Sequence, residues 1–207
     1  MKRLHIVALF VCIAILIPIV AQAQSDVKPI QISLFHPVQI FESETSIYGL
    51  RINLLYGVNQ DVYGLDLGLV NKLTGDMTGA QSGVVNLVEG DVGGVQSGFV
   101  NHVKGDVGGL QSGVVNLVEG DVRGGQSGMV NLANSDFYGC QYGLVNIVKG
   151  TTEGIQTGVY NSAVDMEGLQ IGVVNMAGTL KGLQIGLANI NMSGEPFKFL
   201  PIVNFSF

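Results

Sequence analysis

The stretch Gly79-Ala80-Gln81-Ser82-Gly83-Val84-Val85-Asn86 decides the fold, because variants of it return along most of the chain every 15 residues. The last two repeats shorten to 14 residues. The glutamine column is Gln81, Gln96, Gln111, Gln126, Gln141, Gln156, Gln170 and Gln184, and the asparagine column is Asn71, Asn86, Asn101, Asn116, Asn131, Asn146, Asn161, Asn175 and Asn189. A fixed period of this kind predicts a repeat architecture.

Two degenerate units precede the regular ones. Asp66 takes the glutamine place before Asn71, and one period further upstream Arg51 does so with Tyr56 following. Ten units therefore span residues 47–191.

Each unit is predicted to be one short strand followed by a turn. Fifteen residues are too few for a helical hairpin, glycine disfavours helix, and the β-branched residues around the glutamine favour a pleated strand. The turn is expected between the asparagine of one unit and the first glycine of the next, where Gly90-Asp91 and Gly105-Asp106 lie. Both one-residue deletions fall there too, as turns tolerate them.

The favoured fold is an all-β, parallel β-solenoid or β-roll with coils of 14–15 residues. Identical positions would stack about 4.8 Å apart, so each amide would hydrogen-bond the same amide in the next coil. This gives the repeated Asn and Gln a physical cause as structural ladders. Six apolar positions in each unit are expected to fill a narrow core.

An antiparallel outer-membrane β-barrel of about twelve strands is the alternative. Phe197, Phe199, Val203, Phe205 and Phe207 alternate up to the end of the chain, which resembles the sorting signal of outer-membrane barrels. The repeat itself argues against this fold. Neither side of a strand from Gln81 to Val88 is cleanly apolar, and an asparagine facing lipid is costly.

The chain divides into four segments. Residues 1–23 have a basic start, an apolar run from Ile6 to Val20 and a small-x-small end at Ala21-Gln22-Ala23, which predicts a cleaved secretory signal peptide. Residues 24–46 are expected to form an N-terminal strand or cap, 47–191 the repeat array, and 192–207 a C-terminal strand or cap. The protein is therefore expected to be exported.

Charge and composition exclude several classes of function. Residues 24–207 hold eight Lys and Arg against 16 Asp and Glu, so their formal net charge is −8, and no basic stripe is present for nucleic acid. Cys140 remains alone once residues 1–23 are removed, which leaves no internal disulfide and favours a small buried residue.

No catalytic, cofactor-binding or metal-binding set is predicted, and no small-molecule substrate is evident. His102 occupies a column of Leu and Ile and is interpreted as a variation at that repeat position. The serines recur because the unit recurs, and no fixed base is paired with any of them. Whether the acidic column binds a cation such as calcium is left open, the alternative being solvated turn residues. That column is Asp76, Asp91, Asp106, Asp121 and Asp136.

The unit Gly-x-Gln-x-Gly-x-Val-Asn resembles that of the uncharacterised short-repeat surface proteins of diderm bacteria. The resemblance extends over the opening units Gly49–Gly57 and Gly64–Asn71. It implies a location at the cell surface or outer membrane of a diderm bacterium, with the periplasm as a further option. The Gln-x-Gly-x-x-Asn core is more weakly similar to curlin repeats, which implies stacked strand-turn-strand units.

These observations lead to two functional hypotheses. The first is a non-enzymatic exported envelope protein with a structural, adhesive or assembly role, whose partners are envelope components or other copies of itself. The second, tied to the barrel fold, is a small outer-membrane pore or membrane anchor.

Overall fold

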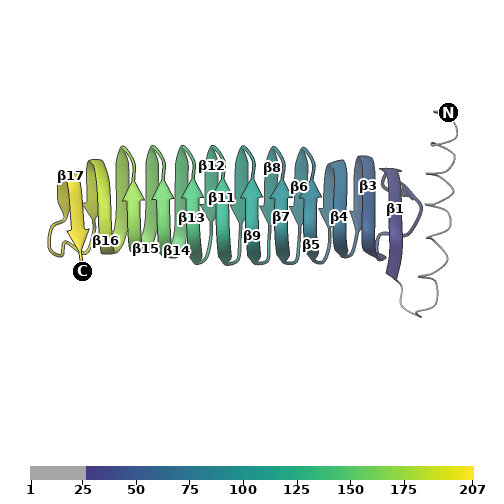
Figure 1. Ribbon diagram of the computed structural model, residues 1–207, viewed down its shortest axis with the longest axis horizontal. Helices are drawn as coiled ribbons and strands as arrows, with labels where there is room; N and C mark the ends of the chain where they lie inside the picture. Colours follow the sequence, from purple (N-terminus) through teal and green to yellow (C-terminus); the bar gives the residue numbers. More distant parts are fainter. Residues whose placement is uncertain (1–26) are drawn as a thin grey trace, which may run out of the picture.

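The computed structural model describes residues 27–207, so the predicted signal peptide lies outside the described residues. This part of the chain is an all-β parallel solenoid of about eleven coils. The coils stack along a straight axis, with β1 at one end of the rod and β17 at the other (Figure 1). No helix is present in residues 27–207.

The rod contains long strands toward its ends and pairs of short strands in its middle. The strands outside the middle are β1 (Val27–Phe35), β2 (Val38–Gln39), β3 (Ser46–Asn59), β4 (Val62–Leu73), β14 (Val145–Thr157), β15 (Tyr160–Ile171), β16 (Val174–Asn191) and β17 (Phe199–Ser206). Those of the middle are β5 (Met77–Ser82), β6 (Val85–Val88), β7 (Val92–Ser97), β8 (Val100–Val103), β9 (Val107–Ser112), β10 (Val115–Val118), β11 (Val122–Ser127), β12 (Val130–Ala133) and β13 (Phe137–Tyr142).

Strands one repeat apart pair in parallel and in register. Gln81 of β5 lies beside Gln96 of β7, and Asn86 of β6 lies beside Asn101 of β8. The parallel register confirms the solenoid prediction. It also overturns the antiparallel twelve-stranded barrel for the described residues, and the pore hypothesis loses its structural basis.

Each middle coil contains two strands, where the sequence pattern predicts one. A bend at Gly83 and Val84 separates β5 from β6. A Cβ on Gly83 would lie 2.6 Å from Nδ2 of Asn71 and 2.7 Å from the carbonyl oxygen of Gly68, so only glycine fits against the stacked coils. The bend also shifts the alternation of inward and outward side chains by one residue. Gln81 and Asn86 are an odd number of residues apart, yet both point inward.

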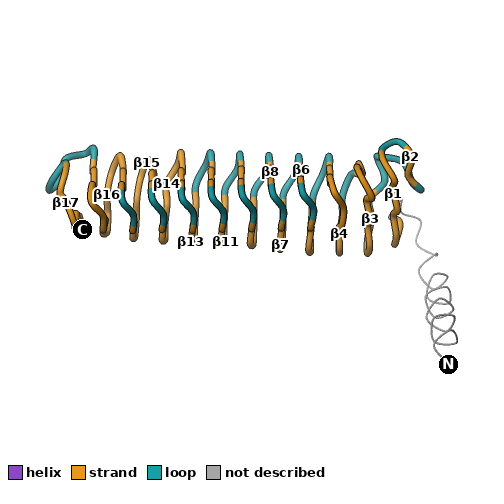
Figure 2. The backbone as a smooth tube through the Cα atoms, turned by 90° about the horizontal axis from the view of Figure 1, so that it is seen from above, coloured by secondary structure: helices purple, strands orange, loops and turns teal. Residues whose placement is uncertain are grey.

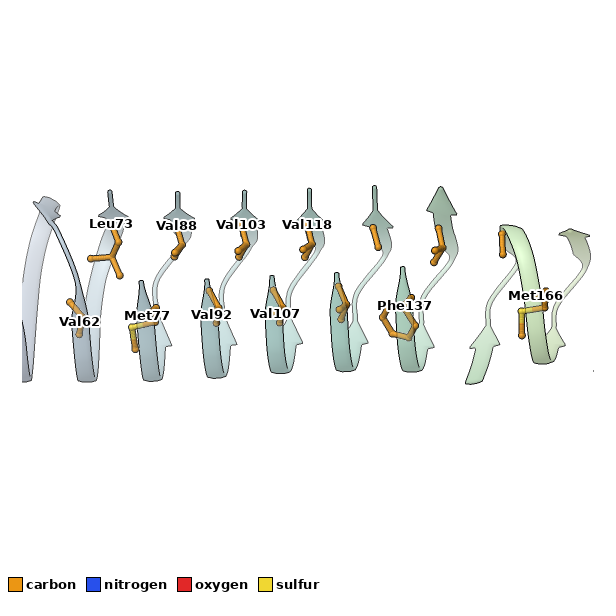
Figure 3. Close-up of a cluster of buried hydrophobic side chains, with 14 of the residues drawn as sticks. Val62, Leu73, Met77, Val88, Val92, Val103, Val107, Val118, Phe137 and Met166 are labelled. Atoms are coloured by element: carbon orange, nitrogen blue, oxygen red, sulfur yellow. The ribbon is translucent and has the colours of Figure 1, made fainter. Parts of the chain in front are cut away.

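The apolar core consists of two columns, one from each strand of the coil. Met77, Val92 and Val107 belong to the first column, and Val88 and Val103 to the second (Figure 3). The expectation that six apolar positions per unit fill the core is therefore wrong. The other four, represented by Ala80, Val84, Val85 and Leu87 in one coil, are exposed or half-buried on the outside.

Thr152 interrupts the first core column and leads to a stability prediction. Its side chain is fully buried, and its Oγ1 has no hydrogen-bond partner. Replacement by valine, the residue used at positions 92, 107 and 122, removes an unsatisfied hydroxyl at nearly constant volume. We expect Thr152→Val to raise the free energy of unfolding by about 1 kcal/mol in chemical denaturation. A loss of stability would mean that this hydroxyl is satisfied in solution.

The two ends of the rod are closed differently. β1 runs parallel to β3 and so adds a further coil, while β2 folds back antiparallel on β1. At the other end β17 runs antiparallel to β16. The two folded-back segments lie at opposite ends of the stack (Figure 2).

Candidate functional site

The glutamines form one continuous ladder inside the rod. Nε2 of Gln96 donates to Oε1 of Gln81 over 2.7 Å, and Gln111 donates to Gln96 over 2.8 Å. The same contact repeats up to Gln184, and every member is at most 1% exposed. All these bonds point from one coil toward the preceding one, so the ladder donates toward the N-terminal end.

The asparagines form a second ladder of opposite polarity. Nδ2 of Asn86 donates to Oδ1 of Asn101 over 2.8 Å and also to the carbonyl oxygen of Ser97 over 2.9 Å. The pattern continues to Asn189, so each donor group is used twice. Because the two ladders run in opposite directions, their amide dipoles oppose each other within every coil.

The glutamine ladder needs an acceptor at its N-terminal end, and Asp66 provides it. Nε2 of Gln81 donates to Oδ2 of Asp66 over 2.7 Å. A carboxylate accepts without donating, so it ends the chain of donors. Asp66, which looks like a degenerate glutamine position in the sequence, therefore ends the glutamine ladder. At the far end Nδ2 of Asn204 lies 3.4 Å from Oε1 of Gln184.

Arg51 neutralises the terminating carboxylate. Its Nε and Nη2 atoms donate to the two oxygens of Asp66 over 2.7 and 2.8 Å, and both side chains are 0% exposed. Nη1 also donates to the carbonyl oxygen of Lys72 over 3.0 Å. A buried carboxylate without this partner would be strongly unfavourable. In the first two units of the array, a hydrogen-bonded ion pair thus occupies the positions that hold glutamine in the later units.

The asparagine ladder begins at a residue that the sequence pattern misses. Tyr56 takes the asparagine place by counting, but in the structure it lies beside Val70. The register shifts between Asn53 and Tyr56, and Asn53 supplies the amide instead, donating to Oδ1 of Asn71 over 2.8 Å. Ser33 in turn donates to Asn53 over 2.7 Å. A bulge of this kind leaves no signal in a fixed repeat spacing.

A central asparagine tests the ladder energetically. Leucine at position 116 would orphan Oδ1 of Asn131 and remove one acceptor from Asn101. We expect Asn116→Leu to lower the free energy of unfolding by about 1–3 kcal/mol, measured by thermal or denaturant unfolding. Ser112→Leu on the exposed side of the neighbouring strand is the control. Melting of the Asn116 variant at the parent temperature would contradict a buried ladder.

The acidic column lies along one edge of the rod and binds backbone amides. Oδ1 of Asp76 accepts the N–H of Asp91 over 2.9 Å, and Oδ1 of Asp91 accepts the N–H of Asp106 over 2.8 Å. The same bond links Asp106, Asp121 and Asp136 to the coil that follows each of them. Within residues 27–207, no group of three or more His, Cys, Asp or Glu side chains is placed to hold a metal ion.

Within this column, the Asp121 carboxylate accepts an additional hydrogen bond from a side chain. The Ser135 hydroxyl donates to its Oδ1 over 2.6 Å and lowers the pKa of the carboxyl below its usual range. Partial burial acts in the opposite direction, while the N–H of Asp136 and the guanidinium of Arg123 lower the pKa further.

This lowered pKa predicts a pH-dependent effect. A carboxyl whose folded-state pKa is depressed stabilises the fold above its unfolded pKa of about 3.9, and that contribution disappears as pH falls through the folded value. We expect Ser135→Ala to lower the melting temperature at pH 7, with the difference shrinking at pH about 2. Ser127→Ala, on the outside of β11, is the control. An equal deficit at both pH values would show that the carboxylate charge plays no part.

A shallow hollow of about 300 Å³ lies on this acidic edge. Gly93 and Gly108 are among its lining residues, and a Cβ on either would meet nothing closer than 3.7 Å. Arg123 also lines the hollow. The hollow is an open groove between repeated side chains, without a convergent set of unlike groups.

The remaining polar side chains singled out in the sequence are dispersed. His102 is half-buried on the outside of β8, with Nε2 3.1 Å from Oε1 of Glu119. His36 lies near the N-terminal end, with its ring 6.3 Å from that of Tyr56. Cys140 is half-buried on the outside of β13 and not in the core as expected. The structure does not bring these three residues together.

Charged and apolar side chains occupy opposite edges of the coil. From residue 79 to residue 191, every Asp, Glu, Lys and Arg lies at a position equivalent to residues 89–93, between the end of one ten-residue block such as 79–88 and the start of the next. The bend on the other side carries a column of outward apolar residues, which we call the apolar edge. It consists of Leu69, Val84, Phe99, Val114, Met129, Leu144, Val159, Val173 and Leu187.

The fold and its ladders define a parallel β-solenoid with two internal amide ladders. Comparison with protein-family models, with curated proteins and with solved structures finds no match to this chain. In the described part of the chain, no helix is long and apolar enough to cross a membrane.

Proposed function

We propose that the chain is a non-enzymatic structural protein of the bacterial cell envelope, exported and held at the cell surface or outer membrane. The rod serves adhesion, envelope structure or assembly by presenting the same surface in every coil. The observation that carries the proposal is the amide interior. The Gln and Asn side chains of the repeats are buried and bonded to their own counterparts.

Repetition itself argues against catalysis. A catalytic site brings unlike groups together, such as a nucleophile, a base and an orienting residue. In this rod the buried amides of the ladders are flanked by copies of themselves in the neighbouring coils, as Gln96 and Gln111 are. Such an arrangement suits a rigid spacer or a regular binding surface.

The location rests on the predicted signal peptide of residues 1–23. The excess of acidic over basic residues in residues 24–207 argues only against nucleic acid as a partner. The amide ladders supply rigidity without disulfides, which matches the single cysteine that remains after residue 23.

Cell fractionation tests this proposal. We expect the full-length chain to be processed near residue 23 and to appear in the envelope fraction, from which alkaline carbonate releases it. Protease added to intact cells then determines whether the rod faces outward. Retention of the unprocessed chain in the cytoplasm would overturn the proposal.

A further inference from the structure

We propose that the apolar edge is a self-association surface, on which a second copy of this chain packs in antiparallel orientation. This inference deepens the assembly role in the proposed function by naming the surface and its occupant. The surface is exposed in a single copy: Phe99 is 59% exposed and Leu187 is 72% exposed. Single exposed apolar residues are ordinary, but a continuous row of them marks an interaction site.

Six of the nine backbone N–H groups on the apolar edge donate to a carbonyl oxygen of the preceding coil. The N–H of Val84 donates to the carbonyl oxygen of Leu69 over 2.9 Å, and the N–H of Phe99 donates to Val84 over 2.8 Å. The same inter-coil bond serves Met129 and Val159. Because these backbone amides at the bend already have protein partners, an apolar partner covers the edge at little polar cost.

Charge does not oppose this contact. The ten residues from Gly79 to Val88, and their counterparts in each later coil, include no Asp, Glu, Lys or Arg. Two copies that meet at the apolar edge therefore keep their acidic edges on the far sides of the pair. The net negative charge of the chain disfavours an anionic lipid surface as the partner.

The size of the edge suits a dimer. Eight of the nine residues are 43–72% exposed. They present on the order of 700 Å² of accessible surface, close to the roughly 800 Å² that each partner buries in a stable interface. The half-buried Val85 and Leu87 columns on the outside of the second strands extend this area.

The repeat spacing favours this chain as its own partner. Side chains along the edge recur once per coil, about every 4.8 Å. A surface that interdigitates with them over the whole rod needs the same spacing, and a copy turned by 180° has it. Two-fold packing uses the same patch on both copies and closes the assembly at two.

Analytical ultracentrifugation of the full chain, expressed with its export signal and purified, tests the proposal. We expect a dimer that persists in about 1 M salt, because the contact is apolar. Phe99→Glu with Met129→Glu should weaken association at least about 30-fold. The matched control is Val95→Glu with Leu110→Glu, two comparably exposed residues on the other outer face, which should leave the dimer unchanged.

Folding of each variant is checked by circular dichroism. Phe99→Ser with Met129→Ser provides a milder change, because serine already occupies the neighbouring exposed column at Ser97 and Ser127. A monomer at about 100 µM would overturn the proposal, as would equal disruption by the control pair. Monomeric protein that binds phosphatidylcholine vesicles through Phe99 and Met129 would also overturn it, in favour of a lipid surface. None of these failures affects the envelope location, which fractionation tests separately.

Discussion

Alanine at Gly109 is expected to cause a large loss of stability, as at the equivalent glycines of the neighbouring coils. Gly109 has a φ of +144°, a backbone conformation that residues with a side chain rarely adopt. A Cβ there would overlap the carbonyl oxygen of Gly94 in the preceding coil. The strain and the overlap together predict a loss of about 3–5 kcal/mol in the free energy of unfolding.

The neighbouring glycine supplies a matched control. Gly108 precedes Gly109 in β9, and a Cβ on it would lie no closer than 3.9 Å to another atom. We expect Gly108→Ala to change the free energy of unfolding by less than about 1 kcal/mol, with either sign. Denaturant unfolding of the two variants measures the difference. Equal stabilities for Gly108→Ala and Gly109→Ala would contradict the close stacking of the coils.

Removal of one partner of the buried ion pair is expected to have a comparable effect. Arg51→Gln leaves the Asp66 carboxylate buried without its cation, and Asp66→Gln leaves the guanidinium without its anion. Each single change should cost about 3–5 kcal/mol, because an unpaired buried charge is left behind. Thermal and denaturant unfolding measure both.

The double variant distinguishes ladder termination from simple charge pairing. Arg51→Gln with Asp66→Gln restores the glutamine that the later coils use, and Gln at 66 still accepts from Gln81. We expect its stability to lie within about 1 kcal/mol of the parent, giving a large coupling energy in the double-mutant cycle. Additive losses would contradict the view that these two residues replace glutamines at the start of one ladder.

The repeat made the main architecture predictable. Gln and Asn at a fixed spacing require a structure in which identical residues meet, and parallel stacking provides it. The turn expected between the asparagine and the next repeat glycine is present in the middle coils, where a bend at Glu89 and Gly90 separates β6 from β7. At the two deletions the expectation is wrong, because β15 and β16 run through these positions as continuous strands. The first deletion appears instead as a register shift between Val148 and Thr151 of β14 and their partners in β15.

Side-chain direction was less predictable, for a geometric reason. The alternation of a single strand puts Gln81 and Asn86 on opposite faces, but the bend at Gly83 and Val84 turns both inward. The same bend turns apolar residues outward. A count of the apolar positions in each unit therefore predicts too many core residues and does not reveal that some of them form the apolar edge. Hydropathy along the chain does not distinguish a residue in the core from one on a flat outer face.

The acidic column shows a second limit. Five aspartates in a row indicated either solvated turns or a cation site. The partner of Asp76 is the backbone N–H of Asp91. Almost every residue has such a donor, so the sequence does not indicate that this one is used. Asn53 was missed for a similar reason, since the bulge in β3 displaces it from the repeat spacing.

The central claim is that the repeats stack linearly in parallel register, and spin-label distances test it most directly. Labels at cysteines replacing Ser82, Thr157 and Ile185, in a Cys140→Ser background, lie in one outward column of the rod. At about 4.8 Å per coil, the pair 82–157 should be about 24 Å apart and the pair 82–185 about 34 Å. Distances that rise in proportion to the number of intervening coils support the solenoid, whereas a longer pair no farther apart than the shorter one would contradict it.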